Sequence, residues 1–310
     1  MESTIVAWNG SGPSRRALEW AVARERRRAG VVRLVAVLDG TTLTARRSIG
    51  SAGGGTAAAL EIAAADVVES SPEIGVETEL RVGDALHELT ALTGPSTLLV
   101  VGTGPRQGPR RRYGWSLGAR LAARASGPVA VIPEPREPPD APTGILVGVD
   151  DTPVSRTAAL VAASEAVLQE EPLWLVNAWQ PPPVWADGLA HDSTLLDELE
   201  RAHEHIVHRL VEEIRALYPM LRVRGEAVRS TAGRALLNAH PTPALVVAGT
   251  RSTRGLQRLL LGSVSQELLT RILTPTIIVP GDPVGDRRGE STRDLRHSAP
   301  LRAVADLKET

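Results

Sequence analysis

Short runs of apolar residues alternate along this chain with longer segments in which Ala and Leu recur at helical spacing. Runs of this length are far too short to cross a membrane, and they fit strands that are buried on both faces. The longer segments have the apolar periodicity of helices that cover a sheet. The pattern therefore predicts an α/β fold with an open, mostly parallel, Rossmann-like sheet.

The second half of the chain shows this alternation most clearly. The predicted strands are 144–149, 173–178, 221–228, 244–248 and 276–279. Helices are predicted from Thr152 or Pro153 to about Gln169, from Ser193 to Leu217, after Gly233, and from Gly262-Ser263. Strands that alternate with helices in this way are typical of a parallel sheet with both faces covered.

The chain also contains an internal repeat. The segment 98–103 (LLVVGT) recurs as 245–250 (LVVAGT), an offset of 147 residues (245 − 98) that holds without a gap to the end of each copy. Near the start of each copy, 5–9 corresponds to 146–150, an offset of 141 (146 − 5). A few residues are therefore inserted between these anchors. The repeat predicts two tandem copies of one α/β domain.

The repeat sets the predicted domain boundaries. The first domain covers 1–133 and the second covers 143–280, and the proline-rich, charged segment 134–142 between them is typical of a linker. The segment 281–310 is charged, has few clustered apolar residues and is predicted to be disordered. Within the first domain, 41–55 ends in three glycines and is predicted to be a flexible loop.

The composition excludes several classes of protein. There is no cysteine, which excludes disulfides, thiolate metal sites and cysteine nucleophiles. The only lysine is Lys308, in the tail, which argues against P-loop, protein-kinase and pyridoxal chemistry because each needs a lysine. The formal net charge is −1, and no targeting segment or membrane-length apolar run is visible. We therefore expect a cytoplasmic protein with neither a nucleic-acid nor a membrane partner.

Small and polar residues lie where strands of the second copy end. Asp150, Ala178 and Gly249 each end a predicted strand, and open α/β sheets bind ligands at that edge. Gly262-Ser263 begins the last helix, whose N-terminus offers N–H groups and a partial positive charge to an anion. Gly-Ser at a helix start is also a common N-cap. On the residues alone, the pair predicts either a cap or a phosphate site.

The loop that joins these residues has a recognisable spacing. Gly249-Thr250-Arg251-Ser252 is followed by nine residues and then by Gly262-Ser263. This resembles the motif of ATP-binding members of the universal stress protein family: a glycine, two residues, a second glycine, nine residues, and a glycine with serine or threonine. Ser252 stands in place of the second glycine. The resemblance extends over about 3–133 and 143–280 and includes the strand 147–150 (VGVD).

The resemblance implies an adenine nucleotide alpha hydrolase-like fold and a site for ATP, alone or with Mg²⁺. It implies that Asp150 and Ala178 border the adenine. The residues that it implies for the ribose and phosphates are Gly249, Arg251, Ser252, Gly262, Ser263, Val264 and Ser265. It also implies an ATP-binding stress-response regulator. The absence of a usable lysine and of a recognisable general base argues against an enzyme, with slow ATP hydrolysis left open.

The resemblance further implies a pairing of the two copies. Members of this family pair through their last strands, so 129–132 is expected to meet 276–279 as in a dimer contained within one chain. A further homodimer is left open.

The first copy departs from the motif. Asn9, Pro105 and Trp115 occupy the positions of the aspartate, the second glycine and the helix-start glycine, and only Gly102 and Ser116 match. Proline has no N–H to offer, and an indole blocks the close approach of backbone to phosphate. The first site is therefore predicted to be degenerate, with a structural or regulatory role.

Two other functions remain open on the sequence. One is a nucleotide-free interaction scaffold in which both sites have decayed, against which the aspartate and the Gly-Ser pair of the second copy argue. The other is a serine hydrolase that uses Ser116, because 114–118 (GWSLG) matches the G-x-S-x-G motif. That motif needs a strand directly before the serine, whereas the preceding segment is predicted to be a loop.

Three histidines on the long predicted helix suggest a metal site at first sight. No pair among His203, His205 and His208 has the spacing of four that the zinc-binding His-Glu-x-x-His motif requires. We expect these side chains to lie on a solvated helix face and predict no metal site.

Overall fold

The computed structural model describes residues 3–39, 43–104, 116–134, 141–181, 193–239, 241–250 and 261–281. The elements of the first half are β1 (Ser3–Trp8), α1 (Gly12–Arg26), β2 (Val31–Leu38), α2 (Leu43–Ser70), β3 (Gly75–Val82), α3 (Ala85–Ala91), β4 (Thr97–Gly102), α4 (Leu117–Arg124) and β5 (Val129–Ile132). Those of the second half are β6 (Ile145–Gly148), α5 (Pro153–Gln169), β7 (Leu173–Trp179), α6 (Ser193–Leu217), β8 (Val223–Arg229), α7 (Ala232–Leu237), β9 (Leu245–Thr250), α8 (Ser263–Thr270) and β10 (Thr276–Pro280).

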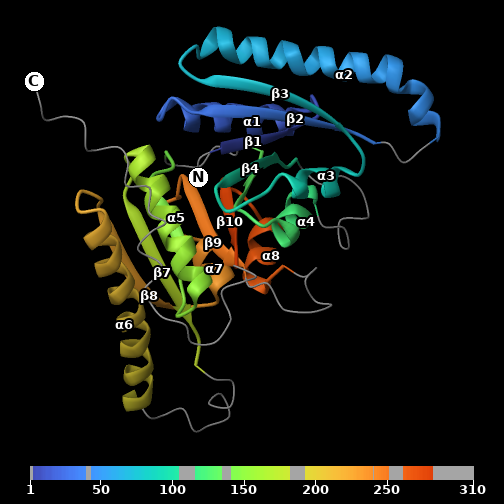
Figure 1. Cartoon of the computed structure of the whole chain (residues 1–310). Coiled ribbons are helices and arrows are strands. Elements are labelled where there is room, and N and C mark those ends of the chain that lie inside the picture. Colours follow the sequence, from blue (N-terminus) through green and yellow to red (C-terminus); the bar gives the residue numbers. More distant parts are fainter. Residues whose placement is uncertain are drawn as a thin grey trace, which may run out of the picture.

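The described strands form one ten-stranded sheet that continues from one half into the other (Figure 1). The strand order is β3-β2-β1-β4-β5-β10-β9-β6-β7-β8. Among these strands every neighbouring pair is parallel except β5 and β10, which are antiparallel. In that central pair Ala130 lies opposite Ile277, and 129–131 pairs with 276–278, the strands that the resemblance implies should meet. The predicted fold class, two tandem α/β domains with open and mostly parallel strands, is confirmed, and the strands of the two halves join in one sheet through β5 and β10.

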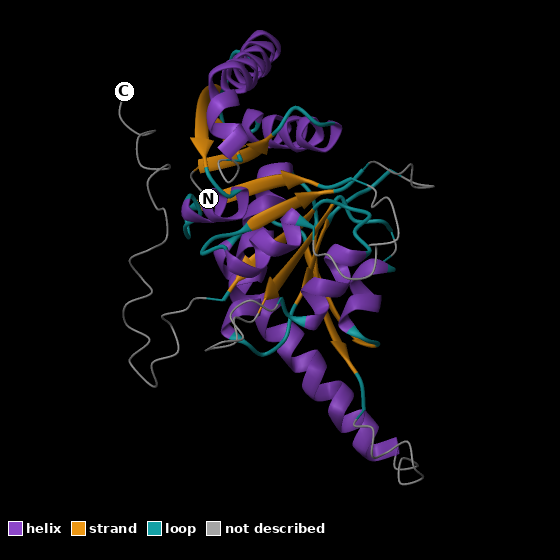
Figure 2. Ribbon diagram, turned by 90° about the vertical axis from the view of Figure 1, so that its right-hand side faces the viewer, coloured by secondary structure: helices purple, strands orange, loops and turns teal. Residues whose placement is uncertain are grey.

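Two clusters of buried side chains fill the space between the sheet and its two layers of helices. One cluster lies under α1, α2, α5 and α6 and includes Leu34, Leu60 and Ile214. The other lies under α3, α4, α7 and α8 and includes Leu121 and Leu236. Figure 2 shows the helices on both sides of the strands. The central strands are accordingly buried on both faces, and all four residues of β5 are buried.

Both clusters are built without phenylalanine, which the chain lacks. Val, Leu, Ile and Ala supply nearly all of the described buried apolar side chains. Helix α5 shows the consequence, because its sheet-facing residues are alanines that are at most 1% exposed: Ala158, Ala159, Ala162, Ala163 and Ala166. A helix face of methyl groups can lie close to the strands, which compensates for the small size of each side chain.

The first helix of each half begins with the same local signal. Ser11 is the N-cap of α1 and accepts a hydrogen bond from the backbone N–H of Ser14. Thr152 is the N-cap of α5 and accepts one from the backbone N–H of Ser155. Each helix also has a proline in its first turn, where the missing N–H removes no helical hydrogen bond. The polar side chain and the proline together fix where each strand ends and each helix begins.

The elements predicted for the second half lie within two residues of the observed bounds, and α7 begins at Ala232, one residue before Gly233. The prediction of a flexible loop over 41–55 is wrong, because 43–55 form the first part of α2. Glycine inside a helix costs only about 1 kcal/mol relative to alanine. The later part of α2 is anchored by buried Leu60 and Val67, and a helix fixed in this way extends through such glycines.

Several predicted segments lie outside the described residues. They include 40–42, most of the linker 134–142, and all but the first residue of the tail 281–310. The predictions of a linker and a disordered tail therefore stay predictions.

Candidate functional site

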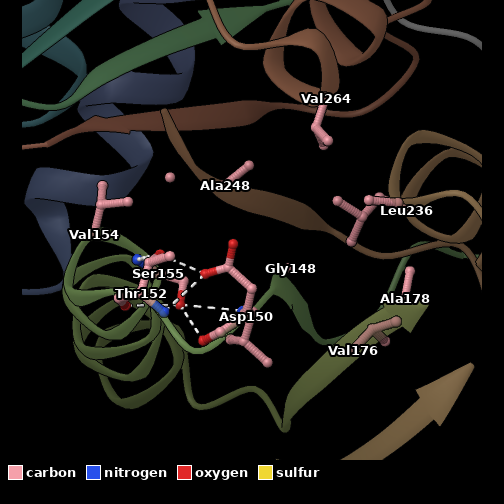
Figure 3. Close-up of a pocket in the computed structure, with 13 residues that line it drawn as sticks. Gly148, Asp150, Thr152, Val154, Ser155, Val176, Ala178, Leu236, Ala248 and Val264 are labelled. Carbon is pink, nitrogen blue, oxygen red and sulfur yellow. Dashed lines mark hydrogen bonds between the residues drawn. The ribbon is translucent and has the colours of Figure 1, made fainter. Parts of the chain in front are cut away.

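Asp150 lies two residues after the end of β6, at the carboxyl edge of the sheet, and its carboxylate helps to start α5. Its Oδ1 accepts hydrogen bonds from the Thr152 backbone N–H, at 3.0 Å, and from the Thr152 hydroxyl. The Ser155 hydroxyl oxygen accepts from the Asp150 backbone N–H at 3.1 Å and lies 2.6 Å from the Asp150 carbonyl oxygen. The side chain is half-buried. Figure 3 shows the Asp150 carboxylate projecting from the strand end over a cavity.

This cavity lies among the ends of β6, β7 and β9 and the starts of α5, α7 and α8. It is open to solvent and has a volume of about 160 Å³, which is smaller than the roughly 300–1,000 Å³ of typical small-molecule pockets. One side is polar, formed by Asp150, Thr152 and Ser155, and the opposite side is apolar (Figure 3). The other lining residues are Gly148, Val149, Val154, Val176, Ala178, Ala232, Leu236, Ala248, Gly249 and Val264.

Gly249 allows the start of α5 to approach the end of β9. A Cβ at this position would lie 3.1 Å from Val154 Cγ2 and 3.2 Å from the Val154 carbonyl oxygen. The equivalent Gly102 is more constrained, since its Cβ would lie 1.8 Å from the carbonyl oxygen of Pro13. Close packing of strand and helix therefore requires glycine at 102, whereas at 249 it leaves only slightly too little room for a methyl group. The match of Gly102 to the motif says nothing by itself about a ligand in the first half.

Helix α8 begins without a side-chain cap. Its N-cap is Gly262, with φ −56° and ψ 150°, and no described side chain makes the capping hydrogen bond. The Gly262 backbone N–H donates to the Thr250 hydroxyl at 3.3 Å, which ties the helix start to the end of β9. Val264, in the first turn, lines the cavity. The first turn of α8 thus offers its N–H groups at the rim of the cavity, the arrangement that suits an anion.

The structure places the predicted site residues in three groups. Asp150, Ala178, Gly249 and Val264 line one cavity. Gly262 and Ser263 lie at the start of α8, and Ser263 is exposed. Ser265 is 1% exposed and its hydroxyl donates to the Gly249 carbonyl at 3.3 Å, so that it joins α8 to β9. Arg251 and Ser252 lie outside the described residues.

Sequence reasoning missed Thr152 and Ser155, which hold Asp150 in place. The signal was present in the repeat, because Ser11 and Ser14 stand at the same positions in the first half. There, Asn9 Oδ1 accepts from the Ser11 backbone N–H at 3.1 Å and from its hydroxyl at 2.6 Å. Asparagine therefore supports the helix start as aspartate does. The two halves differ in the charge at this position and share the local fold.

The two halves also differ at the last helix. Ser116, equivalent in sequence to Ser263, is the N-cap of α4, and its hydroxyl oxygen accepts from the Ala119 backbone N–H at 3.2 Å. The first turn of α4 therefore has the side-chain cap that α8 lacks. Residues 105–115, including Pro105 and Trp115, lie outside the described residues, so the strand that a serine hydrolase requires before Ser116 is untested.

His203 differs from the expected solvated face. Its ring stacks on Trp179 with 5.3 Å between centroids and 8° between planes, and its Nδ1 lies 2.7 Å from the Asn177 side-chain oxygen. The Asn177 amide nitrogen donates to the carbonyl of Val149, next to Asp150, at 2.8 Å. These contacts fix α6 against the strand ends. His205 and His208 are exposed, as expected.

The described residues contain neither a metal-binding group nor a membrane-spanning helix. No three or more His, Asp or Glu side chains within them gather as a metal-binding group. Of the helices in the described part of the chain, none combines the length and the apolar character needed to span a bilayer.

The fold is that of a doubly wound α/β protein, and its cavity lies at the carboxyl edge of the strands, where open α/β sheets bind ligands. The model of the Universal stress protein family matches the chain twice, over residues 1–133 and 143–280. The chain belongs to the universal stress protein family.

Individual relatives agree with this assignment. Universal stress protein MT3220 of Mycobacterium tuberculosis is 34% identical over 262 residues, which cover 82% of this chain and 90% of the relative. Universal stress protein Rv2005c of the same species is 29% identical over 222 residues, covering 69% and 72%. Among solved structures, a universal stress protein from Archaeoglobus fulgidus has a TM-score of 0.65 at 16% identity and covers 90% of this chain and 98% of that one, which shows the shared fold.

Proposed function

We propose that the second half binds an adenine nucleotide, ATP alone or with Mg²⁺, in the cavity beside Asp150. The observation that carries the proposal is the uncapped start of α8 at the cavity rim, because the equivalent helix α4 is capped by Ser116. A nucleotide needs apolar contact for its base and N–H donors for its phosphates. The second half has both around one cavity.

The polarity of the cavity suggests how the ligand lies. The apolar residues Val176, Ala178 and Leu236 suit the face of the base. Asp150 can accept a hydrogen bond from an amino or hydroxyl group of the nucleoside. The first turn of α8 would receive the phosphates, and Mg²⁺ would be held chiefly by phosphate oxygens, as is usual for this ion.

We further propose that the bound nucleotide regulates a conformational or assembly equilibrium of a cytoplasmic stress-response protein and is not turned over rapidly. The chain has no lysine other than Lys308 to stabilise a phosphoryl group in transfer. Release of inorganic phosphate from ATP by the purified protein would measure turnover directly. A rate typical of kinases, roughly 1 s⁻¹ or more, would contradict the regulatory role.

The nucleotide is tested by mass spectrometry of the small molecules released from the purified protein, together with calorimetric titration with ATP and MgCl₂. The decisive variant is Gly262→Trp, which copies Trp115 of the first half into the second. We expect the variant to fold and to lose ATP affinity by more than about tenfold, because an indole blocks the start of α8. Equal ATP binding by both proteins would show that the site is wrongly placed. An original protein that binds no nucleotide would favour the interaction scaffold.

Asp150→Asn provides a matched pair with Asn9→Asp. Asn9 already makes the helix-start hydrogen bonds, so Asp150→Asn should keep the unfolding free energy within about 0.5 kcal/mol while weakening nucleotide binding. Asn9→Asp, at the equivalent position of the first half, should leave binding unchanged. Equal effects of the two substitutions on binding would contradict the assignment to the second half.

A further inference from the structure

Arg24 and Glu165 are equivalent residues of the two halves. The offset of 141 continues from the first strand into the first helix, and it links buried positions in matching order. These positions are Ser14 with Ser155, Ala17 with Ala158, and Ala21 with Ala162. Three residues further along, the same offset joins Arg24 to Glu165 (165 − 24 = 141). The helices therefore carry opposite charges at one shared position.

The two halves meet around a local twofold axis. In the β5–β10 ladder, Ala130 lies opposite Ile277, its own equivalent under the offset of 147 (277 − 130). On either side, Val129 pairs with Ile278 and Val131 with Thr276, as a twofold axis through the central pair requires. Residues that are equivalent and touch each other must lie beside this axis.

Arg24 and Glu165 touch in this way. Arg24 Nε lies 3.1 Å and 3.0 Å from the two carboxylate oxygens of Glu165, and Arg24 Nη2 lies 2.6 Å from Oε1. The side chains are 4% and 0% exposed. The contact is therefore a buried, bidentate ion pair between the halves, formed by equivalent positions across the axis.

Neighbouring groups complete the charge balance. The Glu25 side chain, which is 0% exposed, contacts Arg24 and accepts from Arg28 Nε and from the Thr4 hydroxyl, each at 2.6 Å. Two arginines thus face two glutamates. Burial by itself lowers the pKa of Arg24, but hydrogen bonds and attraction from both glutamates outweigh it, so the pKa lies above its ordinary value. Arg24 is held as a cation.

We propose that the Arg24–Glu165 pair selects pairing between the first half and the second half and excludes pairing of either half with a copy of itself. If two first halves met through β5, the axis would bring Arg24 against Arg24. If two second halves met through β10, it would bring Glu165 against Glu165. Either contact buries two like charges that have no partner across the axis, whereas the native contact buries a matched pair. The proposal does not depend on the nucleotide site.

Single introduced cysteines report which halves have paired, because the chain has no native cysteine. Ala130→Cys places a thiol at the centre of β5, where it faces Ile277 in the native pairing and the same thiol of a second chain if two first halves pair. Directly opposed residues of antiparallel strands lie within disulfide range. Ile277→Cys reports in the same way on pairing of two second halves. The full-length variants are refolded from denaturant under oxidising conditions, and disulfide dimers are quantified.

The test crosses these cysteine variants with Arg24→Gln and Glu165→Gln. In the Ala130→Cys background, Arg24→Gln should raise the yield of dimer by more than about tenfold, because the repulsion between two arginines is gone. Glu165→Gln should not, because two arginines still oppose each other. In the Ile277→Cys background the order reverses. If the pair only strengthened the interface, its loss would loosen the interface equally in both variants. Equal dimer yields would therefore overturn the proposal.

A control and a second measurement make the outcome decisive. Arg26→Gln removes an exposed ion pair with Glu73 from the same helix and should leave dimer yields unchanged. If a glutamine variant does not fold, Arg24→Glu and Glu165→Arg are coexpressed as full chains with tags of different mass. If the two chains exchange halves, opposite charges meet only in the mixed dimer. Native mass spectrometry should then show more than about ten times as much mixed dimer as homodimer. The segment 133–144 between β5 and β6 spans up to about 40 Å, which permits this exchange. A statistical mixture, or no folded mixed dimer, would refute the selection.

Discussion

The same substitution at two equivalent glycines should have unequal effects. Gly102 and Gly249 both lie at the end of a strand that packs against the start of a helix. Gly102→Ala would place a methyl group 1.8 Å from the carbonyl oxygen and 2.2 Å from the carbonyl carbon of Pro13. Gly249→Ala would place it 3.1 Å from a Val154 side-chain carbon and 3.2 Å from the Val154 carbonyl oxygen.

These distances set the magnitudes. In Gly102→Ala, the backbone at the start of α1 must move by more than about 1.5 Å to restore van der Waals distance between the new methyl group and the Pro13 carbonyl oxygen. Such overpacking costs about 3 kcal/mol, reduced by the roughly 0.4–1 kcal/mol that alanine gains by restricting the unfolded chain. At Gly249 a shift of a few tenths of an ångström suffices. The cost and the gain there nearly cancel, so Gly249→Ala should change the unfolding free energy by less than about 1 kcal/mol.

Urea unfolding followed by far-UV circular dichroism, with the linear extrapolation to water, measures both changes. Gly102→Ala should lower the unfolding free energy by about 2 kcal/mol or more and Gly249→Ala by clearly less. If the Gly249 variant lost as much stability as the Gly102 variant, these distances would not account for the cost at Gly249, and the reasoning would be refuted. The comparison uses one chemical change at matched positions, so differences in the unfolded chain cancel.

Two further predictions concern contacts outside the cavity. His203→Ala removes the ring stack on Trp179 and should lower the unfolding free energy by about 1 kcal/mol. His205→Ala, on the exposed face, should leave it unchanged within about 0.5 kcal/mol. Urea unfolding of the two variants measures this difference. The pKa of Glu73 lies below its ordinary value, chiefly because of a hydrogen bond from its own backbone N–H and also because of the ion pair with Arg26. The Glu73 carboxylate should therefore stabilise the fold above its ordinary pKa, and this contribution should be lost as the pH falls through its lowered pKa. NMR titration of the Glu73 carboxyl should give a midpoint below that of an unfolded control.

The fold was predictable because its signals are local and repeated. The caps Ser11 and Thr152 and the apolar strands occur twice at fixed offsets, so each copy supports the interpretation of the other. The contact between Arg24 and Glu165 was not predictable in the same way. The repeat shows that the two positions are equivalent, but only the strand order and the antiparallel centre of the sheet show that they meet.

The clustering of several candidate site residues was predictable, and the exact position of each was not. Asp150, Ala178, Gly249 and Val264 line one cavity because parallel strands end at a common edge. Ser265 is instead occupied by a hydrogen bond to β9, which depends on how α8 is turned about its axis. Sequence alignment of the copies equates residues, but it does not specify the rotation of a helix or which of two neighbouring residues caps it.

The difference in capping gives the most direct test of what the second half has retained. Gly262→Asp would supply the cap that α8 lacks and would add a negative charge at the positive end of the helix. Without nucleotide, the variant should therefore gain about 0.5–1 kcal/mol in unfolding free energy. It should bind ATP more than about tenfold more weakly, because the carboxylate takes the N–H groups and repels the phosphates.

Thermal unfolding with and without ATP measures both effects in one experiment. A variant that is more stable and binds ATP as well as the original would show that the uncapped helix start is not the phosphate site. Gly262→Ser separates the two effects, since serine caps the helix without adding charge. The ATP affinity of this variant should lie between that of the original protein and that of Gly262→Asp.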